Sequence, residues 1–84
     1  MEDFKNKIAV VTGGGTGMGR ELVLQLANDG CHVSMCDIIE ENMQETFDMV
    51  TKQFPDVKIT KHVCDVSIEE DVIRFRAEVL NQQQ

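Results

Sequence analysis

Short apolar runs alternate with longer segments in which apolar positions recur at helical spacing. The apolar runs predict β-strands at Lys7–Thr12, His32–Asp37 and about Val57–Cys64. The uninterrupted apolar centre of the first run predicts a strand that is buried on both faces, as in a parallel sheet.

A helical pattern follows each of these strands. We expect helices over Gly17–Asn28, over Glu40–Phe54, and from Ser67 toward the end of the chain. The run Ser67-Ile68-Glu69-Glu70 has the S-x-x-E spacing of a capping box at the start of the third helix. The stripes expected to face the core are Met18, Leu22 and Leu26 with Val23 beside them; Met43, Phe47, Val50 and Phe54; and Ile68, Val72, Phe75 and Val79.

Three strand–helix units in succession predict an α/β fold. Units of this length force parallel pairing with right-handed crossovers. The expected architecture is βαβαβα, half of a doubly wound parallel sheet with strand order 3-2-1.

Glycine dominates the connection between the first strand and the first helix. The run Thr12–Gly19 reads TGGGTGMG, with five glycines in its last seven positions. The first turn of a helix has unpaired N–H groups and a partial positive charge, which attract phosphate. Glycines let the backbone turn sharply and approach a pyrophosphate closely, and Gly19 would let the helix lie close to the strand. The loop therefore predicts a dinucleotide site.

The spacing T-G-x-x-x-G-x-G is filled by Thr12, Gly13, Gly17 and Gly19, and it resembles the cofactor fingerprint of the short-chain dehydrogenase/reductase family. The resemblance implies a Rossmann-like, NAD(P)-binding domain of an oxidoreductase. Such enzymes move a hydride between a nicotinamide cofactor and a carbonyl or alcohol substrate. The cofactor-binding positions that it implies in this loop are Thr12, Gly13, Gly15, Thr16, Gly17, Met18 and Gly19.

Asp37 is a second match, at the end of the second strand and 18 residues beyond Gly19. A carboxylate at about this spacing can bond the adenosine ribose hydroxyls, and it would repel a 2′-phosphate. Thr16 and Ile38 stand where NADP-using relatives often carry a basic residue. We therefore expect NAD rather than NADP. The alternative is that Asp37 only begins a loop and faces water.

A third match is the run Cys64-Asp65-Val66 at the end of the third strand. In the family, the Asp of such a pair bonds the adenine amino group and the next residue offers backbone contacts, which implies these roles for Asp65 and Val66. The alternative is that Asp65 only ends the strand before the Ser67 cap.

The resemblance spans residues 1–84 but only the N-terminal part of a typical family member, so we expect part of a single cofactor-binding domain. The family's catalytic Ser and Tyr-x-x-x-Lys lie further on, and this chain has no Tyr. We therefore predict no catalytic residue here. Alternatives are a nucleotide-binding or interaction segment without turnover, or a fragment that does not fold.

The resemblance further implies a small-molecule substrate and a homo-oligomer for a full-length protein. Because the outer edge of the first strand would lack its neighbour, we expect the isolated chain to be weakly stable or to self-associate.

The charge and cysteine content narrow the possible partners. The net charge of −7 argues against nucleic acid or an anionic membrane surface. No stretch approaches the ~20 apolar residues of a membrane span, and MEDFKNK does not resemble a signal peptide. Cys31, Cys36 and Cys64 match neither a disulfide framework nor a zinc site, which favours a reducing cytoplasm.

Seven other residues carry weaker predictions. His32 and His62 share no ligand spacing with a Cys or a carboxylate, so structural or exposed roles are expected rather than metal binding. Arg20 could reach a phosphate or lie on the helix surface. The methionines expected to fill the core are Met18, Met35, Met43 and Met49.

Overall fold

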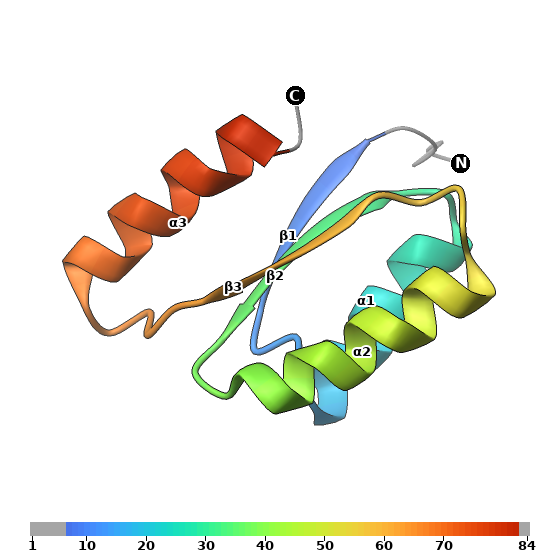
Figure 1. Ribbon diagram of the computed structural model, residues 1–84, viewed down its shortest axis with the longest axis horizontal. Helices are drawn as coiled ribbons and strands as arrows, with labels where there is room; N and C mark the ends of the chain where they lie inside the picture. The colour runs from blue at the N-terminus through green and yellow to red at the C-terminus, as the bar shows by residue number, and fades with distance from the viewer. Residues whose placement is uncertain (1–6, 83–84) are drawn as a thin grey trace.

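The computed structural model describes residues 7–82, which form a three-stranded parallel sheet with three helices (Figure 1). The strands are β1 (Ile8–Thr12), β2 (His32–Asp37) and β3 (Ile59–Val63). Their order is β1-β2-β3, which is the predicted 3-2-1 order seen from the other edge. Ile8 lies opposite His32, and Val33 lies opposite Ile59. The predicted α/β half-sheet is confirmed.

The helices are α1 (Gly17–Asn28), α2 (Glu40–Gln53) and α3 (Glu69–Gln82). In Figure 1, α1 and α2 lie together on one side of the sheet, whereas α3 lies by itself on the other side. This arrangement leaves the carboxyl ends of the strands beside the loops that lead into the helices.

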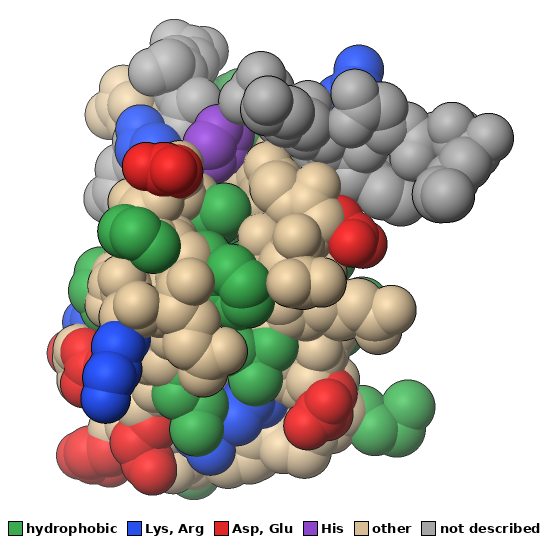
Figure 2. Space-filling model, turned by 90° about the vertical axis from the view of Figure 1, so that its right-hand side faces the viewer, with side chains coloured by type: hydrophobic (Ala, Val, Ile, Leu, Met, Phe, Trp, Pro, Cys, Tyr) green, Lys and Arg blue, Asp and Glu red, His purple; other side chains and the backbone are tan. Residues whose placement is uncertain are grey.

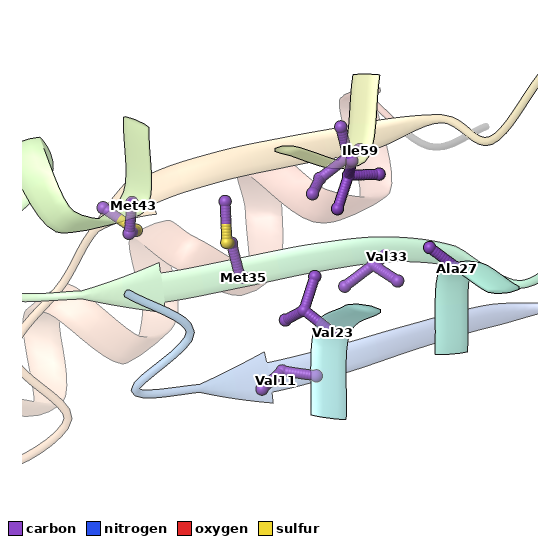
Figure 3. Close-up of a cluster of buried hydrophobic side chains, with 8 residues drawn as sticks. Val11, Val23, Ala27, Val33, Met35, Met43 and Ile59 are labelled. Carbon is purple, nitrogen blue, oxygen red and sulfur yellow. The ribbon is translucent and has the colours of Figure 1, made fainter. Parts of the chain in front are cut away.

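The main core lies between the sheet and the α1/α2 pair (Figure 3). The predicted stripe of α2 is confirmed, since Met43 and Val50 are fully buried and Phe47 and Phe54 pack against the cluster. The buried members of this cluster are Val11, Val23, Ala27, Val33, Met35, Met43, Val50 and Ile59.

The predicted stripe of α1 is confirmed for Val23, which is buried, and for Leu26, which packs against the core cluster, but it is wrong for Met18 and Leu22. Met18 and Leu22 are 89% and 49% exposed, whereas Val23 and Ala27 are buried. Gly19, Val23 and Ala27 follow one another at four-residue intervals, and their small side chains let this face of the helix lie close to the loop and the sheet. Packing distance, rather than residue size, therefore selects the inner face of α1.

The methionines divide into two pairs. Met35 and Met43 are completely buried and fill the core as predicted. Met18 and Met49 are exposed, so that prediction is wrong for them. The exposed pair lies on helix faces turned away from the sheet, where the described chain supplies no covering element.

The prediction that β1 is buried on both faces is wrong. Val11 faces the core and is buried, but Ile8 and Val10 on the opposite face are 50% and 53% exposed. On that face α3 packs on β3, and Phe75 is buried against Cys36 and Cys64. Apolar side chains reach the surface elsewhere too: in Figure 2 they form a band with acidic side chains on both sides.

The start of α3 also differs from the prediction. The helix begins at Glu69 rather than Ser67, and the Ser67 hydroxyl donates to Asp65 Oδ1 at 2.7 Å. No capping box forms around Ser67 among residues 7–82, because the preceding carboxylate competes for its hydroxyl. Ile68, expected on the inner stripe, precedes the helix and is 46% exposed. None of the helices within residues 7–82 has the length and apolar character needed to span a membrane.

Candidate nucleotide-binding site

The glycine-rich loop folds over the carboxyl end of β2. The N–H groups of Gly13 and Gly14 both donate to the carbonyl oxygen of Cys36, at 2.7 and 3.2 Å. Gly13 and Gly17 have φ angles of +70° and +60°, a region that disfavours side chains. Both ends of the loop are therefore turned by glycines, and its first two residues are bonded to the neighbouring strand.

The remaining glycines are required by close contacts. A Cβ on Gly14 would lie 2.6 Å from Met35 Cβ, and one on Gly15 would lie 2.7 Å from Asp37 Oδ2. A Cβ on Gly19 would overlap the carbonyl oxygen of Gly13. The predicted close approach at Gly19 is thus made to the loop backbone rather than to a strand.

Asp37 is directed at this loop. Its Oδ2 accepts the Gly15 N–H at 3.0 Å, and its Oδ1 accepts the N–H groups of Ile38 and Ile39 at 2.7 and 3.4 Å. The carboxylate is therefore oriented by backbone donors from both sides rather than only facing water. A carboxylate has about four acceptor positions, so Asp37 can accept further donors.

A cleft of about 290 Å³ opens beside Asp37 at the carboxyl ends of the strands. It brings together four of the predicted positions: Thr12, Gly13, Asp37 and Val66. The rest of its lining consists of Cys36, Ile38 and Cys64. Gly15 is joined to it through Asp37, whereas Thr16, Gly17 and Met18 are exposed at the start of α1, outside the lining.

Asp65 lies at the turn into α3 and does not line the cleft. Its Oδ1 accepts the N–H of Ser67 at 2.9 Å and the hydroxyl of Ser67 at 2.7 Å. The Ser67 hydroxyl, followed by the Ser67 N–H, lowers the pKa of the Asp65 carboxyl. The Asp65 N–H donates to Asp71 Oδ2 at 3.0 Å. This residue therefore has a structural role in the turn, whatever else it binds.

The first turn of α1 differs electrostatically from those of the other two helices. It carries no acidic side chain, and its N-cap Thr16 makes no side-chain capping bond. By contrast, α2 begins with Glu40 and Glu41, and α3 begins with Glu69, Glu70 and Asp71. The N–H groups at the start of α1 therefore have no carboxylate competing for them, which suits an anion.

Arg20 is the site residue whose role the sequence did not reveal. Its Nη2 donates to the carbonyl oxygens of Gly15 and Asn42 at 2.6 and 3.1 Å, and its Nε donates to Thr46 Oγ1 at 2.9 Å. Its side chain is only 21% exposed, so it does not lie on the free helix surface. The sequence signal that could have revealed this role is Thr46, a polar residue between Met43 and Val50 on the inner face of α2. The structure shows that Thr46 is fully buried.

The histidines lie away from this site. His32 Nδ1 accepts the Lys58 N–H at 2.9 Å, and His62 is buried beneath α3. Within residues 7–82 no three His, Cys, Asp or Glu side chains are grouped as a metal site would need.

A family model described as short chain dehydrogenase matches residues 7–84. Levodione reductase from Leifsonia aquatica is 33% identical over 69 residues, which are 82% of this chain and 26% of the relative. Dehydrogenase/reductase SDR family member 4 from Sus scrofa is 35% identical over 78 residues, 93% of this chain and 27% of the relative. The chain thus spans about a quarter of the length of these curated relatives.

Solved structures agree. NAD+-bound xylitol dehydrogenase superimposes with a TM-score of 0.90 at 29% identity, covering 98% of this chain and 31% of that one. An NADPH-bound short chain oxidoreductase from Pseudomonas aeruginosa PAO1, described as having an atypical catalytic center, gives 0.91 at 28% identity, covering 98% and 32%. Sequence and fold therefore lead to the same conclusion: the chain belongs to the short chain dehydrogenase family.

Proposed function

We propose that this chain is the cofactor-binding part of a nicotinamide-dependent oxidoreductase, which moves a hydride between NAD(H) and a carbonyl or alcohol substrate. One observation carries the proposal: the Asp37 carboxylate bonds the glycine-rich loop at the mouth of a cleft formed by all three strand ends. Crevices outside the carboxyl ends of the strands are where open α/β sheets bind nucleotides.

The proposed roles follow from position. Asp37 accepts the ribose hydroxyls, the loop and the first turn of α1 receive the pyrophosphate, and Val66 forms an apolar wall of the cleft. The loop residues proposed for this are Thr12, Gly13, Gly15, Thr16, Gly17, Met18 and Gly19. Asp65 is proposed for the adenine amino group, since within residues 7–82 its Oδ2 has no hydrogen-bond partner.

NAD is proposed in preference to NADP. A 2′-phosphate would meet the Asp37 carboxylate. Arg20 does not line the cleft, and its Nη2 and Nε donate to Gly15, Asn42 and Thr46. Solved relatives include both an NAD+-bound and an NADPH-bound protein, so the preference rests on these residues.

The properties of the whole protein are further proposals. We infer a small-molecule substrate and a homo-oligomer from the family. A cytoplasmic location is supported by three free, buried cysteines at 31, 36 and 64. The absence of Tyr from these 84 residues favours nucleotide binding without turnover by these residues themselves.

Calorimetric titration with NAD and with NADP tests this proposal. We expect NAD to bind more tightly, and Asp37→Ala to weaken NAD binding by about 10-fold or more. Asp37→Asn keeps an acceptor for Gly15 but removes the charge, so it should narrow the preference for NAD over NADP. Asp56→Asn, at an exposed turn, is the matched control. Equal binding of both nucleotides by the unmodified chain, or none, would contradict the proposal.

A further inference from the structure

We propose that Arg20 is a positioning residue for the nucleotide site: it fixes the peptide of Gly15 so that the glycine-rich loop is ordered before a phosphate arrives. The inference rests on the proposed function, and it adds α2 to the parts of the fold that determine affinity.

The geometry around Gly15 is the starting point. Its carbonyl oxygen accepts Arg20 Nη2 at 2.6 Å and the Thr46 hydroxyl at 3.2 Å. Its N–H donates to Asp37 Oδ2 at 3.0 Å. Both polar groups of this buried residue are therefore held by side chains from three different elements.

Arg20 connects these elements. It lies in α1, yet its guanidinium also donates to the Asn42 carbonyl and to Thr46 Oγ1 in α2. Its side chain is 21% exposed, and Thr46 is fully buried. The carboxylate of Glu45, which is largely exposed, lies 3.9 Å from Arg20 Nη2. Charge-assisted bonds of this kind are stronger than neutral ones when water is largely excluded.

The effect on binding follows from the composition of the loop. Glycines lose more conformational freedom on ordering than any other residue. If the loop were mobile in the free protein, a phosphate would have to order it, and affinity would fall accordingly. Arg20 and Thr46 remove that requirement at Gly15. An adenosine without phosphate does not use the phosphate-facing amides, so its affinity depends less on this order.

The test compares NAD with adenosine by calorimetry for the unmodified chain, Arg20→Met, Arg20→Lys and Thr46→Val. Arg76→Met, which removes an exposed arginine from α3, is the matched control. We expect Arg20→Met to weaken NAD binding about 10-fold and adenosine binding less than about twofold. Arg20→Lys keeps the charge but has a single donor nitrogen, so its NAD affinity should fall between those of the unmodified chain and Arg20→Met. Amide hydrogen exchange of residues 14–17 in the ligand-free chain should accelerate in Arg20→Met but not in Arg76→Met.

Equal losses for NAD and adenosine would show a merely structural role and overturn the inference, as would unchanged NAD affinity with unchanged exchange. If Arg20→Met does not fold, Thr46→Val and Arg20→Lys provide the same comparison. If the unmodified chain binds no NAD, the proposed function fails, whereas loop exchange still shows whether Arg20 orders the loop.

Discussion

The two faces of the sheet are built in different ways. The face toward α1 and α2 is apolar, and its Val33 and Met35 are completely buried. The face toward α3 carries a chain of hydrogen bonds instead. Ser34 Oγ lies 2.7 Å from Thr60 Oγ1, which lies 3.0 Å from His62 Nε2, and His62 Nδ1 lies 2.8 Å from Glu78 Oε1.

Fewer apolar side chains are buried on the α3 face than on the face toward α1 and α2. The ring of Phe75 packs edge-on against His62 at a centroid distance of 5.0 Å. Between β1 and α3 a groove of about 220 Å³ remains, lined by Val10, Phe75, Arg76, Val79 and Leu80. Non-directional burial thus dominates on the face toward α1 and α2. Directional bonds contribute more on the α3 face, where one side of β1 stays partly uncovered.

The largest expected loss of stability comes from a substitution on the apolar face of the sheet. Met35→Ala should lower the free energy of unfolding by about 2–5 kcal/mol, because a cavity replaces a completely buried side chain. Urea unfolding followed by circular dichroism measures it. Met18→Ala removes the same side chain where it is 89% exposed and should change stability by less than about 0.5 kcal/mol. Similar losses in both variants would refute the assignment of the core.

A smaller loss of stability is expected from a substitution on the sheet face toward α3. His62→Ala removes the hydrogen bonds that link Thr60 to Glu78, and it should lower the free energy of unfolding by about 1–3 kcal/mol. The loss should be local, so amide exchange should accelerate in α3 while α1 and α2 keep their protection. His32→Ala, at the start of β2, is the control and should leave α3 unchanged. Uniform acceleration across all helices would mean that the two faces are not separable.

The thiols of Cys36 and Cys64, which line the cleft, make the stability of the chain depend on pH. Burial, followed by the neighbouring Cys64 thiol, raises the pKa of Cys36 from 9.0 to about 11. Stability from the protonated thiol is therefore fully present below about pH 9 and is lost as pH rises through 11. Iodoacetamide should alkylate Cys36 slowly at pH 8 in the folded chain and rapidly in urea, as read by mass spectrometry. Equal rates would contradict this burial.

The smallest effect on stability is expected on the uncovered part of β1. Val10→Lys changes a side chain that is 53% exposed, so stability should shift within about 0.5 kcal/mol. If the open edge and groove drive self-association, the lysine should reduce it, because charges on edge strands oppose pairing. Sedimentation velocity measures this, with Lys58→Arg, at an exposed position that keeps its charge, as the control. A chain that is monomeric before and after the substitution would refute self-association through β1.

The order of elements could be predicted from the sequence because period, turn residues and spacing are local signals. The bounds of α1 and β2 agree with the prediction, and β3 is two residues shorter at its start and one residue shorter at its end. The exposed face of β1 could not be predicted, since an apolar run does not reveal whether a second layer covers it.

The site was only partly predictable for the same reason. Glycine spacing and Asp37 identified the loop and the strand end that lie together. Glycine is needed at position 15 because of a close contact with Asp37, and at position 19 because of one with Gly13. These contacts could be found only in the folded structure. Arg20 and Thr46 meet across 26 positions of chain, a distance at which no local pattern applies.

The proposed nucleotide site is tested most directly by titrating the ¹⁵N-labelled chain with NAD and following its amide chemical shifts. We expect shifts confined to residues 12–19, 37–38 and 65–66, where the loop, Asp37 and the cleft lie. No shifts at saturating NAD, or shifts centred on the groove between β1 and α3, would contradict it.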